Sequence, residues 1–86
     1  MAKKSYKDFY PLANNGNPKA QHEIGLAFSK GEGTRKNAKK ALVWFRKSAK
    51  QGYPPAQFSI GKAYELGEGV REDKKKAFGW YAQVHE

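Results

Sequence analysis

Cysteine is absent from this 86-residue chain, which excludes disulfide bonds, thiolate chemistry and cysteine-based zinc sites, and fits a reducing compartment. No apolar run approaches the ~20 residues of a membrane span, and the N-terminal basic residues precede no apolar signal segment. Histidine occurs only twice, and neither His22 nor His85 has carboxylates or further histidines at metal-ligand spacing. We therefore expect a cytoplasmic protein that is not an enzyme and that needs no cofactor or metal.

Acidic residues are scarce relative to basic ones, since the chain has 8 against 17 and a formal net charge of +9. The excess is local, because residues 34–50 carry seven basic side chains and no acidic one, whereas residues 51–86 carry five of each sign. A field of this kind favours acidic partners, whether protein, nucleic acid or anionic lipid, and does not choose among them.

What the sequence does contain is an internal repeat with a period of 36 residues. Aligning residues 13–50 with residues 49–86 without a gap gives 16 identities in 38 positions. Self-similarity at a fixed period of this length is the signature of a helical repeat array. Among the identical pairs are Gly16/Gly52, Pro18/Pro54, Ile24/Ile60, Gly25/Gly61 and Trp44/Trp80.

The repeat predicts an all-α fold, an α/α superhelix (solenoid) of two 36-residue helix-turn-helix repeats preceded by a short N-terminal helix. We expect a single domain over residues 1–86, with the N-terminal helix at about 6–14, repeat one at about 15–50 and repeat two at about 51–86. A proline inside a helix is unfavourable by ~3 kcal/mol, so the N-terminal segment is either kinked at Pro11 or begins its helix near that residue.

The first helix of each repeat, helix A, is predicted from its start signals and from two glycines. Asn17 is placed to cap the free N–H groups and Pro18 suits the first helical position, so helix A of the first repeat runs to about Lys30. Gly25 and Gly61 are unfavourable in a helix interior by ~1 kcal/mol relative to alanine. Their recurrence therefore predicts that a neighbouring helix approaches too closely for a Cβ atom.

The second helix of each repeat, helix B, follows a Gly-x-Gly segment in which Gly31 and Gly67 are expected to close helix A in the left-handed conformation. Asn37 and Asp73 are placed to cap helix B. The apolar face of helix B in repeat one is predicted to pack against helix A and contains Ala38, Ala41, Leu42, Phe45, Ser48 and Ala49, with Trp44 at its edge.

The pattern Ala-x-x-Gly-x-x-x-Ala-Gln-x-x-Ile-Gly-x-x-aromatic-x-x-Gly-x-Gly, followed by Lys-Ala-x-x-Trp-aromatic, resembles the Sel-one-like repeat, a relative of the tetratricopeptide repeat. The resemblance covers residues 13–85 and occurs twice. It implies an α/α superhelix that acts as a scaffold or adaptor for protein–protein interaction, often in bacteria, and it does not imply catalysis. Thr34, in place of an apolar residue, and His85, in place of a small one, depart from the pattern.

In related superhelices helix A lines the inner groove, so the resemblance implies a groove that binds a partner peptide or helix. Leu26 and Phe58 suit the role of apolar anchors, and packing on the N-terminal helix or between repeats is an equally open alternative for them. Both histidines are expected at the surface. The implied groove positions are Lys19, His22, Leu26, Ser29, Lys30, Pro55, Phe58, Lys62, Glu65 and Leu66.

A continuous basic face on the far side of the first helix B suggests an alternative function. Such a face is suited to neutralising several phosphates of nucleic acid or another polyanion, although simple solvation is the commoner role of lysines on an outer helix. The basic face consists of Arg35, Lys36, Lys39, Lys40, Arg46, Lys47 and Lys50.

The last predicted helix carries large apolar residues that no later repeat in this chain covers. Two-fold pairing of two chains would bury them in a homodimer, and the alternatives are a monomer or a piece of a longer repeat array. The surface proposed for self-association consists of Phe78, Trp80, Tyr81 and Val84.

Overall fold

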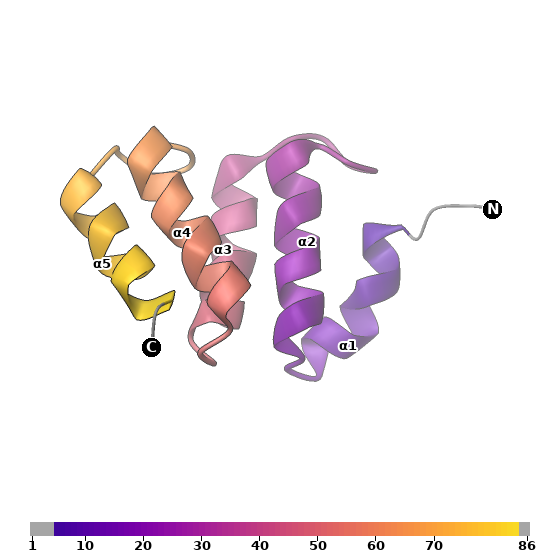
Figure 1. The fold of residues 1–86 in the computed structure, drawn as a ribbon. Coiled ribbons are helices and arrows are strands. Elements are labelled where there is room, and N and C mark those ends of the chain that lie inside the picture. Colours follow the sequence, from indigo (N-terminus) through magenta and orange to yellow (C-terminus); the bar gives the residue numbers. More distant parts are fainter. Residues whose placement is uncertain (1–4, 85–86) are drawn as a thin grey trace.

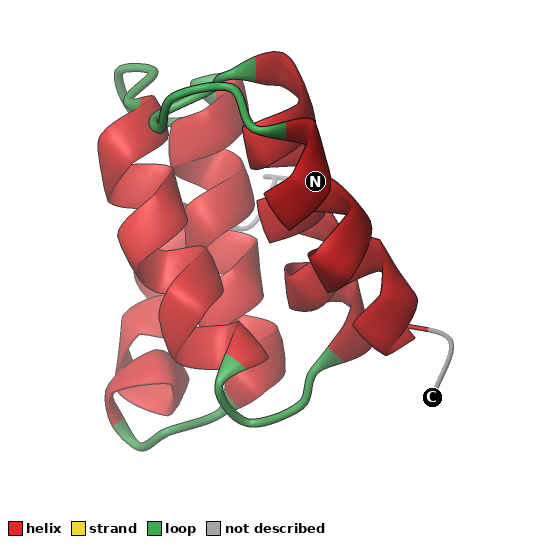
Figure 2. Ribbon diagram, turned by 90° about the vertical axis from the view of Figure 1, so that its left-hand side faces the viewer, coloured by secondary structure: helices red, strands yellow, loops and turns green. Residues whose placement is uncertain are grey.

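The computed structural model describes residues 5–84, and every regular element in that range is a helix (Figure 1). The chain is a short solenoid in which helix A and helix B of each repeat pack together and the two repeats stack side by side. The connecting loops lie at the two ends of the helices (Figure 2). The elements are the 3₁₀ helix η1 (Tyr6–Phe9) and the α-helices α1 (Tyr10–Asn14), α2 (Pro18–Lys30), α3 (Ala38–Ala49), α4 (Pro54–Leu66) and α5 (Lys74–Val84). Helix A corresponds to α2 in repeat one and α4 in repeat two, and helix B corresponds to α3 and α5.

The N-terminal segment consists of two short helices in sequence. Ser5 and Asp8 form a capping box that starts η1, and Pro11 lies in the first turn of α1, where a missing N–H leaves no helical hydrogen bond unmade. Of the two alternatives for Pro11, the structure shows a helix that begins beside it. The segment packs on α2, and the rings of Tyr6 and Phe28 form a T-shaped contact with centroids 5.5 Å apart.

The starts of α2, α3 and α5 and the ends of α2 and α4 lie at the predicted capping residues. Asn17, Asn37 and Asp73 each accept a hydrogen bond from the backbone N–H three residues later, at 2.9, 3.0 and 3.0 Å. Gly31 and Gly67 close α2 and α4 with φ values of 72° and 71°, a left-handed conformation that glycine adopts without strain.

Close packing of helix A on helix B depends on the glycines in the middle of helix A. A Cβ atom on Gly25 would lie 2.5 Å from Cε1 of Phe45, and one on Gly61 would lie 2.6 Å from Cε1 of Tyr81. The predicted close approach is therefore confirmed in both repeats, and the neighbour that requires it is an aromatic ring of helix B.

The two repeats meet where α3 packs against α4. Leu42 of α3 is 4% exposed in this interface, and the loop after α4 comes so near that a Cβ on Gly69 would lie 2.7 Å from the carbonyl oxygen of Ala38. Arg46 donates a hydrogen bond of 3.2 Å to the hydroxyl of Tyr64 across the same boundary. The junction is thus a fitted interface that continues the core from one repeat into the next.

Candidate functional site

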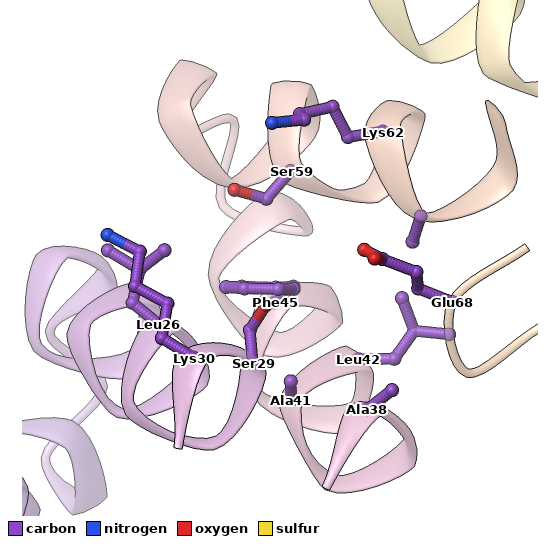
Figure 3. A pocket seen from close by; sticks show the side chains of 11 residues that line it. Leu26, Ser29, Lys30, Ala38, Ala41, Leu42, Phe45, Ser59, Lys62 and Glu68 are labelled. Carbon is purple, nitrogen blue, oxygen red and sulfur yellow. The ribbon is translucent and has the colours of Figure 1, made fainter. Parts of the chain in front are cut away.

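A cavity of about 120 Å³ opens at the junction of the two repeats, between α2, α3 and α4 (Figure 3). Helix α3 provides apolar side chains only, and α2 and α4 each add a serine and a lysine beside an apolar residue. Neither repeat alone builds the cavity, because its lining comes from both. The lining residues are Leu26, Ser29, Lys30, Ala38, Ala41, Leu42, Phe45, Ser59, Lys62, Ala63 and Glu68.

Charged side chains are unequally distributed around this cavity. Lys30 and Lys62 are both exposed, and Figure 3 shows the ammonium group of Lys30 across the Phe45 ring from the carboxylate of Glu68, with that of Lys62 above the ring. Within the described part of the chain, none of these three side chains forms an ion pair. The cavity therefore combines apolar side chains with one cation from each of α2 and α4 and one carboxylate from the loop after α4.

Four of the ten implied groove residues line the cavity: Leu26, Ser29, Lys30 and Lys62. Leu26 also packs against the core cluster, as the packing alternative predicts, and its role as an anchor for a partner stays a prediction. Lys19 is exposed at the start of α2, and Pro55 and Leu66 are exposed near the two ends of α4.

His22 does not lie on the surface, which corrects the sequence-based expectation. Its side chain is 8% exposed, its ring packs against those of Phe45 and Tyr53, and its Nε2 lies 3.0 Å from the hydroxyl oxygen of Ser59. Burial lowers the pKa of His22, and the charge of Glu23 opposes this shift. The helical wheel placed His22 opposite Ile24, but α3 and the following repeat cover that side of α2. His85 lies outside the described residues.

Phe58 and Glu65 lie beside α5, outside the cavity. Phe58 is 49% exposed, and its ring packs on Tyr81 at a centroid distance of 5.4 Å. Glu65 accepts a hydrogen bond of 2.6 Å from the Tyr81 hydroxyl. Burial, this hydrogen bond and the charge of Glu65 together raise the pKa of Tyr81 to about 12.

Sequence reasoning missed the cavity-lining residues of α3, two small residues of α4, and Glu68 in the loop after α4. Leu42 and Phe45 were assigned only to packing within repeat one, whereas both also border the space between repeats. Ser59 and Ala63 carried a usable signal, because they are small residues that flank Lys62 on α4. Glu68 carried none, since its place depends on how the loop after α4 meets α3.

The seven residues of the basic face are all exposed, as expected for an outer helix. Several of their cations contact aromatic rings of the same chain. The ammonium group of Lys47 lies 5.2 Å from the ring centroid of Trp44, and that of Lys40 lies 5.6 Å from the centroid of Phe28. Repeat two has the equivalent contact between Lys76 and Tyr64, also at 5.6 Å.

The residues proposed for self-association differ in exposure. Phe78 is 75% exposed, whereas Trp80, Tyr81 and Val84 are partly buried. Tyr81 is the ring that packs over Gly61 within its own repeat. Of the four side chains, that of Phe78 therefore offers the largest free apolar surface.

In the described range, the structure contains no cluster of three metal-ligating side chains and no helix long and apolar enough to cross a membrane. Buried side-chain nitrogen and oxygen atoms of that range all have hydrogen-bond partners. The polar groups of the interior are accordingly accounted for by the fold itself.

Comparison with known proteins agrees with this architecture. The Sel1 repeat model matches residues 18–53 and 54–83. A protective antigen of uropathogenic Escherichia coli strains, which displays an SLR fold, is similar over 96% of this chain with 36% identity and a TM-score of 0.91. A Sel1 repeat protein from Oxalobacter formigenes is similar over 93%, with 36% identity and a TM-score of 0.90. This chain spans 18% and 61% of their respective lengths. No curated protein matches.

Proposed function

Because this chain belongs to the Sel1 repeat family, whose repeats generally mediate protein–protein interaction, we propose that it is a non-catalytic adaptor that binds a segment of a protein partner between α2 and α4. The family is generally a scaffold fold without catalysis. The observation that carries the proposal is the cavity at the junction of the repeats, which is built jointly by α2, α3 and α4.

The cavity has the composition of a site for one anchoring side chain. Its interior presents Leu42 and Phe45, and its edges present the partly exposed Leu26 and Ser29 together with Ser59. Interface energy is concentrated in a few apolar anchors that fill such pockets, while the surrounding polar contacts exclude water. A peptide or helix lying along α2 and α4 would place one such anchor between them.

Filling the cavity tests this proposal. Ser29→Leu adds an isobutyl group to the α2 side of the cavity, and Ser29 makes no side-chain hydrogen bond whose loss would confuse the result. Gln83→Leu is the matched control, because it adds the same group to an exposed position of α5. Each immobilised protein is incubated with lysate of its source cells, and retained proteins are quantified by mass spectrometry at low and high salt.

We expect at least one protein to be retained by the wild type and by Gln83→Leu and to be lost with Ser29→Leu, at both salt concentrations. Equal retention by all three proteins would reject the cavity as the binding site. Retention that disappears at high salt, and on reversing the charges of Lys39 and Lys50, would indicate polyanion binding by the basic face instead.

A further inference from the structure

Leucine and lysine exchange places between the two helices that flank the cavity. On α2, Leu26 precedes Lys30 by four residues, whereas on α4 the equivalent positions hold Lys62 and Leu66. Side chains four residues apart share one face of a helix, so each helix presents one apolar and one cationic side chain on that face. Leu26, Lys30 and Lys62 all reach the cavity, which therefore has two cations beside its apolar interior.

We infer that the cavity selects a partner segment in which an aliphatic side chain adjoins an aspartate or glutamate, the aliphatic group entering the cavity and the carboxylate pairing with Lys30 and Lys62. This inference rests on the proposed function and names the chemistry of the segment that the adaptor binds. Its physical basis is the size of the cavity, the character of its interior and the position of its charges.

The size and interior of the cavity suit a single aliphatic side chain. Its volume is about 120 Å³, somewhat less than the ~150 Å³ of an apolar cavity that holds one benzene molecule. The side chains of Ala41, Leu42 and Phe45 supply no hydrogen-bonding atoms, and the hydroxyl of Ser59 already contacts His22. A polar group pushed against these three apolar side chains would lose its bonds to water without replacing them.

The charges of the cavity favour a carboxylate beside Lys30 and Lys62. Lys30 and Lys62 are exposed, and within the described range no carboxylate of this chain pairs with either of them. Glu68 borders the cavity across from Lys30 and would repel a second anion there (Figure 3). An acidic residue next to the anchor is therefore favoured where it reaches Lys30 and Lys62 and disfavoured next to Glu68.

Small probes separate these contributions in the intact protein. Hexanoate carries an apolar tail and a carboxylate, hexylammonium carries a cation on a tail that is one carbon longer, and acetate carries the anion with only a methyl group. Titration of each into ¹⁵N-labelled protein is followed through the amide resonances of Ser29, Ser59 and Ala63. We expect hexanoate to shift these resonances with an affinity at least ~5-fold higher than that of either other probe.

Charge reversal provides the matched comparison. Lys30→Glu/Lys62→Glu should abolish the preference for hexanoate over hexylammonium or invert it. Lys39→Glu/Lys50→Glu changes the net charge equally on exposed positions of the outer face and should leave the preference intact. Equal affinity for hexanoate and hexylammonium in the wild type, or an effect of equal size from both double variants, would overturn the inference.

Two further comparisons distinguish a peptide from a lipid as the source of the carboxylate. The blocked peptide acetyl-Gly-Leu-Asp-Gly-amide should bind more tightly than its Leu-Asn counterpart, and dodecanoate should gain nothing over hexanoate because the cavity holds only a short chain. Affinity that rises steadily with fatty-acid length would overturn the choice of a peptide. Failure of all these probes while Ser29→Leu still abolishes partner capture would reject this inference and leave the proposed function standing.

Discussion

The ring of Phe45 occupies the space in which the side chain of residue 25 would begin, since a Cβ on Gly25 would lie 2.5 Å from ring atom Cε1. Tyr81 stands in the same relationship to Gly61 one repeat later. In each repeat an aromatic residue of helix B packs over a glycine of helix A, so the two helices approach more closely than an alanine would allow.

Replacing these glycines by alanine should destabilise the protein. The helix itself gains ~1 kcal/mol from alanine, but forcing a methyl group into a filled interior costs ~1–3 kcal/mol. We expect Gly25→Ala to lower the free energy of unfolding by up to ~2 kcal/mol, because Phe45 is 5% exposed and has little room to move. Urea denaturation followed by circular dichroism measures this change.

Gly79 supplies the control for that measurement. It lies in α5, and a Cβ at this position would meet no atom within 4 Å. Gly79→Ala should therefore raise the free energy of unfolding by up to ~1 kcal/mol through helix propensity alone. Stabilisation by Gly25→Ala of the same size would show that the ring of Phe45 moves aside at no cost.

The burial of His22 makes stability depend on pH. Because burial lowers the pKa of His22 below its ordinary value of 6.5, the unfolded chain takes up a proton before the folded chain does as the pH falls. The stabilising contribution is complete above pH 6.5 and is lost as the pH falls from there through the lowered pKa. The free energy of unfolding should therefore decrease with decreasing pH in that window.

His22→Phe isolates this effect, because repeat two already holds Phe58 at the equivalent position. The unfolding free energies of wild type and variant are measured from pH 4.5 to 7.5 and subtracted. The subtraction removes the contribution of the carboxylates that titrate in both proteins. We expect the difference to change with pH below 6.5 and to be constant above it. A difference that is flat throughout would mean that His22 titrates alike in the folded and unfolded chains.

Tyr81 and Glu65 give a second pH effect of opposite direction. The pKa of Tyr81 is raised from 10.0 to about 12, so the folded chain keeps a proton that the unfolded chain loses between these values. The contribution to stability is complete below pH 10 and is lost as the pH rises toward 12. Titration of the tyrosine Cζ resonances should show that Glu65→Gln lowers the pKa of Tyr81, whereas Glu72→Gln, on an exposed residue of the loop before α5, should leave it unchanged.

Leu42 and Phe78 occupy equivalent positions and should respond very differently to truncation. Leu42 is 4% exposed because repeat two covers it, and Phe78 is 75% exposed. Leu42→Ala should cost ~2–5 kcal/mol, the range for buried leucines, whereas Phe78→Ala should change stability by less than ~1 kcal/mol. Thermal unfolding of the two variants tests the contrast, and similar losses would show that Phe78 is covered in solution.

The contacts that sequence predicts well are those within one repeat. The period of 36 residues, the caps at Asn17, Asn37 and Asp73, and the approach of helix B to Gly25 depend on local signals, and the structure contains all of them. Contacts between repeats were not predictable in the same way. A helical wheel gives the direction of His22 relative to its own helix and contains no information on what the next repeat places there.

The residues of the candidate site were predictable only in part. The family resemblance implied that helix A forms the groove wall, and three of the residues it named, Leu26, Ser29 and Lys62, line the cavity. It also included Phe58 and Glu65, which lie on the equivalent face of repeat two but contact Tyr81 of α5. Equivalent sequence positions thus acquire different environments according to the position of their repeat in the stack.

The fitted interface between the repeats also bears on how such an array grows by gene duplication. The side of repeat two that faces repeat one packs against a surface of repeat one that contains His22 and Leu42. A duplicated copy of repeat two placed after the original would instead meet Phe58 and Phe78, both bulkier than their counterparts. Substitutions that make room for these two side chains would have to accompany the duplication. The sequence of each repeat is therefore matched to its position in the array.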